Sequence, residues 1–185
     1  CAEQQYQPFE YLCQTLQTLV NIEEFSFVFE GFYEFGNEEL LVYLSDLLSN
    51  LKKISKLKIS FARDTCLTEK TILKFFGNLY KNLPKLTQVS INLSACTNIS
   101  DQTVINLGVL FSKIINLAKL DIIFRECRVS SIGVSALCRQ LKKLHCLKSL
   151  FMDFSECRIS EKDKITGLLK SFTNLEEKTL LLTTS

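Results

Sequence analysis

Short apolar segments recur along the chain in a constant phase. Each segment opens with two spaced apolar residues and ends with an alternating stretch, as in LAKLDIIF at 117–124. Successive segments start 32, 32, 31, 30 and 28 residues apart, at 22–29, 54–61, 86–93, 117–124, 147–154 and 175–182. A phase that is kept over so many copies indicates an array of equivalent structural units.

The second half of each segment alternates with a period of two. In the fourth copy Leu120, Ile122 and Phe124 fall on one side, and Asp121 and Ile123 fall on the other. Alternation among β-branched and aromatic residues predicts a short strand with one buried face. We therefore expect one strand in each unit, with inward residues that resemble those of the neighbouring units.

A helical pattern follows each strand after a loop. Within 99–114, one stripe with a helical period holds five apolar residues, which are Val104, Leu107, Leu110, Phe111 and Ile114. Thr68, Ser100 and Ser160 precede acidic residues and are predicted as helix N-caps. Pro84 is predicted to lie just after the end of a helix.

A single strand and helix cannot bury their apolar faces alone. Stacked units share a continuous core when a parallel sheet lies inside and the helices lie outside, joined by right-handed crossovers. The predicted fold class is therefore α/β, a solenoid of about five to six repeats of 28–32 residues. We expect one domain over 1–185 and a section of a longer array, because 9–21 reads as the helix of a preceding unit and no polar cap follows the last strand.

The repeated pattern resembles a known family. L-x-x-L-x-L followed by a turn residue and a helix looks like a leucine-rich repeat. The helical half is similar to the ribonuclease-inhibitor-like class, and ACTNISD at 95–101 is similar to the cysteine-containing repeats of F-box ubiquitin-ligase receptors. The resemblance covers about 9–182, although the strand half is two residues longer than the family pattern and the longest loop, at 30–39, is aromatic.

The resemblance also implies a role for three cysteines that occupy equivalent turns. In the family, Asn or Cys at this place lies inside the turn and holds the loop backbone. Cys96, Cys127 and Cys157 are then expected to form a column along the solenoid. In the unit before them, alignment places Asp64 in that column and Cys66 two residues later.

Composition and charge narrow the classes of partner. The net charge is only +2, and the lysines are spread along the sequence without a basic run among stacking aromatics, so we expect no nucleic acid. No apolar run reaches the ~18 residues of a membrane-spanning helix, and we expect no membrane association. Most of the 8 cysteines sit in apolar patterns, which favours a reducing, cytoplasmic compartment, with a cytoskeletal or ciliary assembly as one option.

The sequence offers little catalytic or ligand-binding chemistry. The chain has 1 His, His145 beside Cys146, and no C-x-x-C pair, so neither a zinc site nor an activated nucleophile is indicated. The glycine-rich loops that cradle phosphates are absent from the sequence. We therefore expect no enzyme activity, no cofactor, no metal and no small-molecule substrate.

The outward residues of the strands line a concave surface in such a solenoid and are the candidate binding site. The first half of this surface is mostly small and polar, whereas the second half combines apolar and charged residues, as protein-binding hot spots do. The predicted partner-binding residues are Lys58, Asp121, Ile123, Arg125, Phe151 and Asp153. The alternative is that Ile123 and Phe151 contact only each other or a flanking segment.

The resulting hypothesis is a non-enzymatic protein-interaction module, acting as a scaffold or recognition subunit of a larger intracellular assembly. Two alternatives remain open. The repeats could form the substrate-recognition domain of an F-box-type ubiquitin ligase, or the regulatory arm of a kinase. An F-box or kinase motifs in flanking sequence would separate these alternatives.

Overall fold

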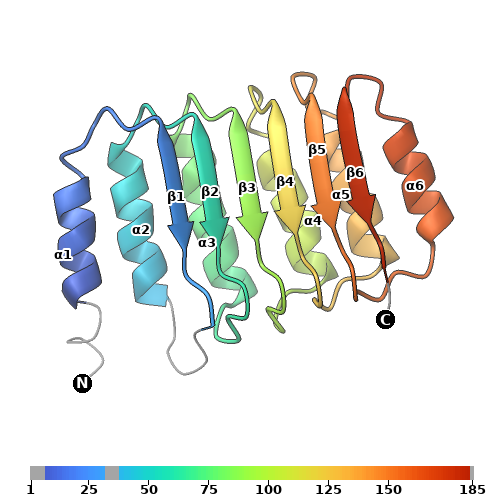
Figure 1. Cartoon of the computed structure of the whole chain (residues 1–185), viewed down its shortest axis with the longest axis horizontal. Coiled ribbons are helices and arrows are strands. Elements are labelled where there is room, and N and C mark those ends of the chain that lie inside the picture. The colour runs from blue at the N-terminus through green and yellow to red at the C-terminus, as the bar shows by residue number, and fades with distance from the viewer. Residues whose placement is uncertain (1–6, 32–37, 184–185) are drawn as a thin grey trace.

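The computed structural model describes residues 7–31 and 38–183, in which helices and strands alternate (Figure 1). The helices are α1 (Gln7–Leu16), α2 (Glu38–Asn50), α3 (Glu69–Asn82), α4 (Asp101–Phe111), α5 (Ser131–Leu141) and α6 (Lys162–Lys170). The strands are β1 (Glu24–Val28), β2 (Lys56–Ser60), β3 (Gln88–Asn92), β4 (Lys119–Ile123), β5 (Ser149–Asp153) and β6 (Glu177–Leu181). The predicted α/β solenoid is confirmed.

The strands form one parallel sheet in chain order, from β1 to β6. Equivalent residues of successive units lie side by side, as the pairing of Val89 with Leu120 and of Leu120 with Leu150 shows. The helices lie on one side of the sheet and leave its other face uncovered (Figure 1). This unshifted register turns each position of the repeat into a column that runs along the molecule.

The inward columns make one continuous core. Its three layers are nearly uniform in residue type: Leu57, Val89, Leu120 and Leu150; Ile59, Ile91, Ile122 and Met152; and Phe61, Leu93, Phe124 and Phe154. All twelve are buried, and full burial of such a side chain stabilises a fold by about 1.5–3 kcal/mol. Phe124 and Phe154 also pack ring against ring, with centroids 5.6 Å apart.

A left-handed residue ends the strand segment in five successive units: Gly31, Arg63, Ala95, Glu126 and Glu156. Each donates its backbone N–H to a carbonyl of the following unit, at 2.7–3.0 Å. Four of the five are not glycine, so inter-unit hydrogen bonding and the buried neighbours hold a conformation that L-residues seldom adopt.

The residue after this turn points into the solenoid, and the predicted cysteine column is confirmed. The Sγ atoms of Cys96, Cys127 and Cys157 donate to carbonyl oxygens of the preceding unit at 3.1, 3.1 and 3.0 Å. Asp64 takes the place in the unit before, as predicted from the alignment. Its Oδ1 accepts the backbone N–H groups of Cys66 and Leu67 instead.

The helix starts were predicted with one error. Thr68 caps α3 and Ser100 precedes α4, as expected, and Pro84 follows the end of α3. Ser160 is not an N-cap, because α6 begins at Lys162 after Glu161. The hydroxyl of Ser131, one unit earlier, accepts the N–H groups of both Ser160 and Glu161, so a neighbouring unit decides where this helix starts.

Two further expectations concern the aromatic loop at 30–39 and the N-terminal helix. Most of the aromatic loop at 30–39 lies outside the described residues, as do the first six positions. The expected helix within 9–21 is present as α1, which ends at Leu16. Among the described helices, none has the length and apolar character that a membrane crossing requires.

Candidate functional site

The uncovered face of the sheet carries the outward columns predicted from the sequence. The register pairs Asp121 with Phe151 and Ile123 with Asp153, so these four residues form a compact block on β4 and β5. We call this block, with the adjoining Lys119, the β4–β5 patch. It brings together four of the six predicted binding residues.

The other two predicted residues lie at its margins. Lys58 lies two strands away on β2, and Ser90 of β3 separates it from Asp121. Arg125 lies beyond the end of β4, where its exposed guanidinium pairs with the carboxylate of Glu126 at 3.3 Å. The sequence therefore predicted which side chains lie on the uncovered face, and the compact block is smaller than the predicted set.

In the first half of the face, the polar side chains of one column have partners within the chain. Ser60 is buried, and its hydroxyl donates to the carboxylate of Glu30, which follows β1 in the preceding unit. The side-chain oxygen of Asn92 accepts both the N–H and the hydroxyl of Ser94, at 3.0 and 2.6 Å. These side chains already have hydrogen-bond partners within the chain, so they offer a ligand few free donors or acceptors.

The β4–β5 patch differs because it places two partly exposed apolar side chains beside charged residues, whereas Val28 on β1 is a single exposed apolar side chain in the column of Ile123. Ile123 and Phe151 are half-buried on adjacent strands, whereas the same columns hold Ser90 and Asn92 on β3. A parallel sheet holds both side chains on a rigid backbone, so little conformational freedom is lost when a partner covers them. The patch can therefore accept an apolar side chain of a partner.

Asp121 sets the electrostatics of the patch. Partial burial raises the pKa of its carboxyl group, and the nearby charges of Lys119 and Lys58 oppose that effect. Lys119 Nζ lies 3.9 Å from Asp121 Oδ2, which is a loose pairing between partly exposed groups. Asp121 is thus an incompletely paired anion beside an apolar surface.

Asp153 stabilises the turn after β5, which the sequence did not predict. Its Oδ1 accepts the backbone N–H of Ser155 at 2.9 Å. The bond matches the one between Asn92 and Ser94, two units earlier in the same column. Oδ1 of Asp153 therefore helps to form the turn, and its second carboxylate oxygen and its charge remain for recognition.

The sequence prediction missed Lys119 and Thr179. Lys119 is the outward residue one alternation before Asp121, and Thr179 pairs with Phe151 on β6. Both follow from the period-two pattern when the columns are extended by one position and by one strand. The reasoning that predicted the neighbouring residues could therefore have predicted Lys119 and Thr179 as well.

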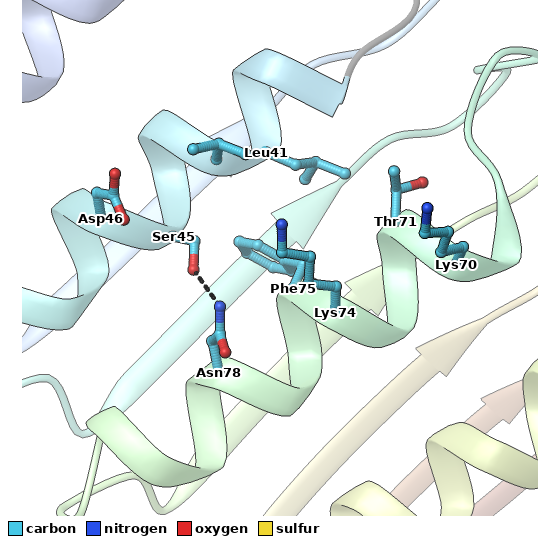
Figure 2. A pocket seen from close by; sticks show the side chains of 9 residues that line it. Leu41, Ser45, Asp46, Lys70, Thr71, Lys74, Phe75 and Asn78 are labelled. Carbon is cyan, nitrogen blue, oxygen red and sulfur yellow. Dashed lines mark hydrogen bonds between the residues drawn. The ribbon is translucent and has the colours of Figure 1, made fainter.

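A second concavity lies between two helices on the opposite side of the molecule (Figure 2). It is a groove of about 200 Å³ between α2 and α3, with Leu41 and Phe75 among its lining residues. The amide of Asn78 donates to the hydroxyl of Ser45 across the groove at 3.0 Å. This bond ties the two helices together, so the groove reads as a packing feature of neighbouring units.

The buried thiols are not suited to act as nucleophiles. Burial raises the pKa of Cys96 to about 12 and that of Cys138 to about 11, which keeps both protonated at neutral pH. The seven cysteines in the described part of the chain are free thiols. In that part no three His, Cys, Asp or Glu residues gather as metal ligands would.

Comparison with known proteins supports the fold. Searches find no matching family model and no matching curated protein. The solved structure of leiomodin-1 actin-binding site 2 is similar with a TM-score of 0.55 and 16% identity, over 80% of this chain and 79% of that chain. Internalin C2 from Listeria monocytogenes aligns with a TM-score of 0.33 and 16% identity, over 90% of this chain and 84% of that one.

The likeness to leiomodin-1 agrees with the sheet topology and the repeat period described above. It does not extend to the ribonuclease-inhibitor-like, cysteine-containing class, which stays a prediction from the sequence. The chain has the fold of a leucine-rich-repeat solenoid.

Proposed function

We propose that this chain is a non-enzymatic protein-interaction module that binds its partner through the β4–β5 patch. One observation carries the proposal. Ile123 and Phe151 stand partly exposed in columns where β3 holds Ser90 and Asn92. Large apolar side chains on a rigid surface, ringed by charges, are typical of binding hot spots.

The patch also indicates the chemistry of the partner. A partner segment with an apolar side chain would cover Phe151 and Ile123, and a cation beside it would meet Asp121 and Asp153. Such a cation lowers the pKa of Asp121 and compensates for its partial burial, so recognition and charge neutralisation occur together. We expect an apolar-basic segment on the partner.

The comparison is consistent with this role. The similar domain of leiomodin-1 is an actin-binding site, so the fold is able to present a protein-binding surface. Free, mostly buried thiols support placement of the module in a reducing compartment, as a scaffold or recognition subunit of a larger assembly.

The test replaces the β4–β5 patch with residues that the protein already uses. Asp121→Ser, Ile123→Asn, Phe151→Ser and Asp153→Asn give each position the side chain found in its column on β3. The Asn at position 153 retains an acceptor for the N–H of Ser155, as Asn92 does for Ser94. The variant should therefore fold normally.

The matched control removes the same kinds of side chain from the helical layer, with Asp46→Ser, Val109→Asn, Ile132→Ser and Asp163→Asn. All four are exposed. Quantitative affinity capture from native extract should lose specific proteins with the patch variant and keep them with the control. Equal capture by both variants contradicts the proposal.

A further inference from the structure

The edge of the solenoid where helices end and strands begin carries cations and no acidic residues over four consecutive units. It is the upper edge in Figure 1. The segments 50–56, 80–88, 111–119 and 139–149 hold no Asp or Glu. They hold eleven cations, which we call the lysine edge: Lys52, Lys53, Lys56, Lys81, Lys85, Lys113, Lys119, Arg139, Lys142, Lys143 and Lys148.

These cations face solvent, and all eleven are exposed. Three of them form ion pairs: Lys56 with Glu24, Lys119 with Asp121 and Lys148 with Glu176. Within the described part of the chain, the other eight form none. The positive charge of this edge is therefore largely uncompensated.

The opposite edge has a different character. The segments 61–69, 93–101, 124–131 and 154–163 mix five cations with seven acidic residues. The helix dipole favours cations at the C-terminal ends of helices, where Lys81 and Arg139 lie in the last turn and Lys142 is the C-cap of α5. Lys52 Nζ donates to the carbonyl oxygen of Asn82 at the end of α3, and Lys53 Nζ donates to Asn21 Oδ1. These roles account for five of the eleven cations, and the other six lie beyond the helix ends.

Exposed apolar side chains project from loops on the same edge. Leu19 and Val20 lie in the loop before β1 and are about half exposed, while Ile115 lies in the loop before β4 and is 72% exposed. No packing within the chain explains an isoleucine so open to water at a loop tip. Apolar tips among lysines are suited to a surface that is both anionic and apolar.

We propose that the lysine edge docks on the surface of a bilayer that contains acidic phospholipids. The cations would approach the headgroups, and Ile115, Leu19 and Val20 would enter the boundary below them. The sequence led us to expect no membrane association because no apolar run is long enough to span a bilayer, but docking on a bilayer surface needs no such run. Lysines about one repeat apart in sequence become neighbours along one edge once the solenoid forms.

The observations favour a bilayer over a nucleic acid. Ten of the eleven cations are lysine, which lacks the forked geometry that recognises phosphate in two places at once. Tyr80 is the only Tyr in these four segments, and its ring already contacts Lys113 and Lys81, at 5.0 and 5.8 Å from the ring centroid. It is therefore poorly placed for base stacking.

The first test measures vesicle binding by co-sedimentation. Wild type should bind vesicles of phosphatidylcholine with 30% phosphatidylserine and should not bind phosphatidylcholine alone, and added salt should weaken binding. Lys85→Glu, Lys113→Glu and Lys143→Glu together should weaken it by at least about a hundredfold, since the loss of each lysine near the surface costs roughly fivefold and each glutamate adds repulsion. The control Arg63→Glu, Arg128→Glu and Arg158→Glu makes the same charge change on the opposite edge and should have a much smaller effect.

The second test locates the contact and needs no loss of binding. The chain has no Trp, so Ile115→Trp introduces a single fluorescent reporter. Its emission should shift to the blue with acidic vesicles. Ile132→Trp should not shift, although Ile132 on α5 is as exposed as Ile115, at 71% against 72%.

Four results would overturn the proposal. Wild type could fail to bind acidic vesicles, or both charge-reversal variants could lose binding equally. The two tryptophan reporters could shift alike. A duplex oligonucleotide or polyglutamate could displace the protein from vesicles at a charge concentration below that of the lipid, which would assign the edge to a nucleic acid or an acidic protein.

Discussion

The two faces of the same sheet differ in how they repeat. Along the inward face of β2–β5, successive units present Leu or Val, then Ile or Met, then Phe or Leu, and only the terminal strands depart from this, with Phe25 on β1 and Lys178 on β6. Along the outward face the central column reads Ser26, Lys58, Ser90, Asp121, Phe151 and Thr179. Both faces share the same backbone, so the difference between them reflects the constraints on the side chains of each face.

An inward position must fill a fixed volume between the sheet and the helices, so each unit needs nearly the same side chain. An outward position has no such constraint, and its residue can vary without cost to the fold. Variation on that face is therefore where a binding surface can be specified. The patch at β4 and β5 is the place where variation produces an apolar, charged block.

The largest expected effect comes from truncating an inward phenylalanine. Phe124→Ala removes a fully buried ring and should lower the free energy of unfolding by about 3–5 kcal/mol. Phe151→Ala removes the same ring from the outward face and should cost about 1 kcal/mol or less. Urea unfolding of both variants measures the difference, and equal losses would mean that Phe151 is also a core residue.

The next effect concerns hydrogen bonds that pass between units. The carboxylate of Asp101 accepts the N–H and the hydroxyl of Ser130 at 2.7 and 2.6 Å, and the N–H of Gly133 at 3.2 Å. Asp101→Ala should cost about 1–3 kcal/mol because it leaves these donors without their acceptor. Gly133→Ala should also destabilise, since the new Cβ would lie 2.4 Å from Asp101 Oδ1.

The control for Asp101 is Asp163→Ala, which removes an exposed aspartate from the first turn of α6. It should cost no more than about 1 kcal/mol. If thermal unfolding shows the same loss for both aspartates, the bonds between units contribute nothing beyond the helix dipole.

A smaller loss is expected in the cysteine column. Cys127→Ala removes a buried thiol and the hydrogen bond to the carbonyl of Leu93, and should cost about 1–2 kcal/mol. Cys146→Ala, at an exposed position, should stay within about 0.5 kcal/mol. A thiol reagent should label native Cys146 and spare Cys127, and rapid labelling of Cys127 would contradict its place in the core.

The smallest effect is the pH dependence that Asp121 contributes. Burial raises its pKa in the folded protein above the ordinary value of an aspartate, so ionisation destabilises the folded state. This penalty is absent below both pKa values and develops as pH rises through the raised one. Asp121→Asn should therefore gain melting temperature relative to wild type as pH increases from about 3.5 to 7, by an amount equivalent to about 0.5 kcal/mol at most. A relative loss over that range would mean that its pairing with Lys119 and Lys58 outweighs burial.

Local periodicity was enough to predict the fold and the columns. Leu120, Ile122 and Phe124 alternate with Asp121 and Ile123, and that pattern alone fixes which side chains share a face. The cysteine column and its break at Asp64 followed from the same alignment together with the family resemblance. These features depend on short-range spacing and on equivalence between units.

The features that the sequence missed depend on contacts between units. The hydroxyl of Ser131 moves the start of α6, and Oδ1 of Asp153 accepts a backbone N–H that completes a turn. The lysine edge arises because residues in different loops, such as Lys85 and Lys113, align only after the units stack. Such properties appear once neighbouring repeats are placed side by side.

The central claim is that the outward residues of β4 and β5 contact a protein partner. Carboxyl footprinting of the captured complex, read by mass spectrometry, tests it most directly. Asp121 and Asp153 should be labelled in the free protein and protected in the complex, while Asp46 and Asp163 on the helical layer are labelled equally in both. Unchanged labelling of Asp121 and Asp153 in the complex, with protection elsewhere, would contradict the account.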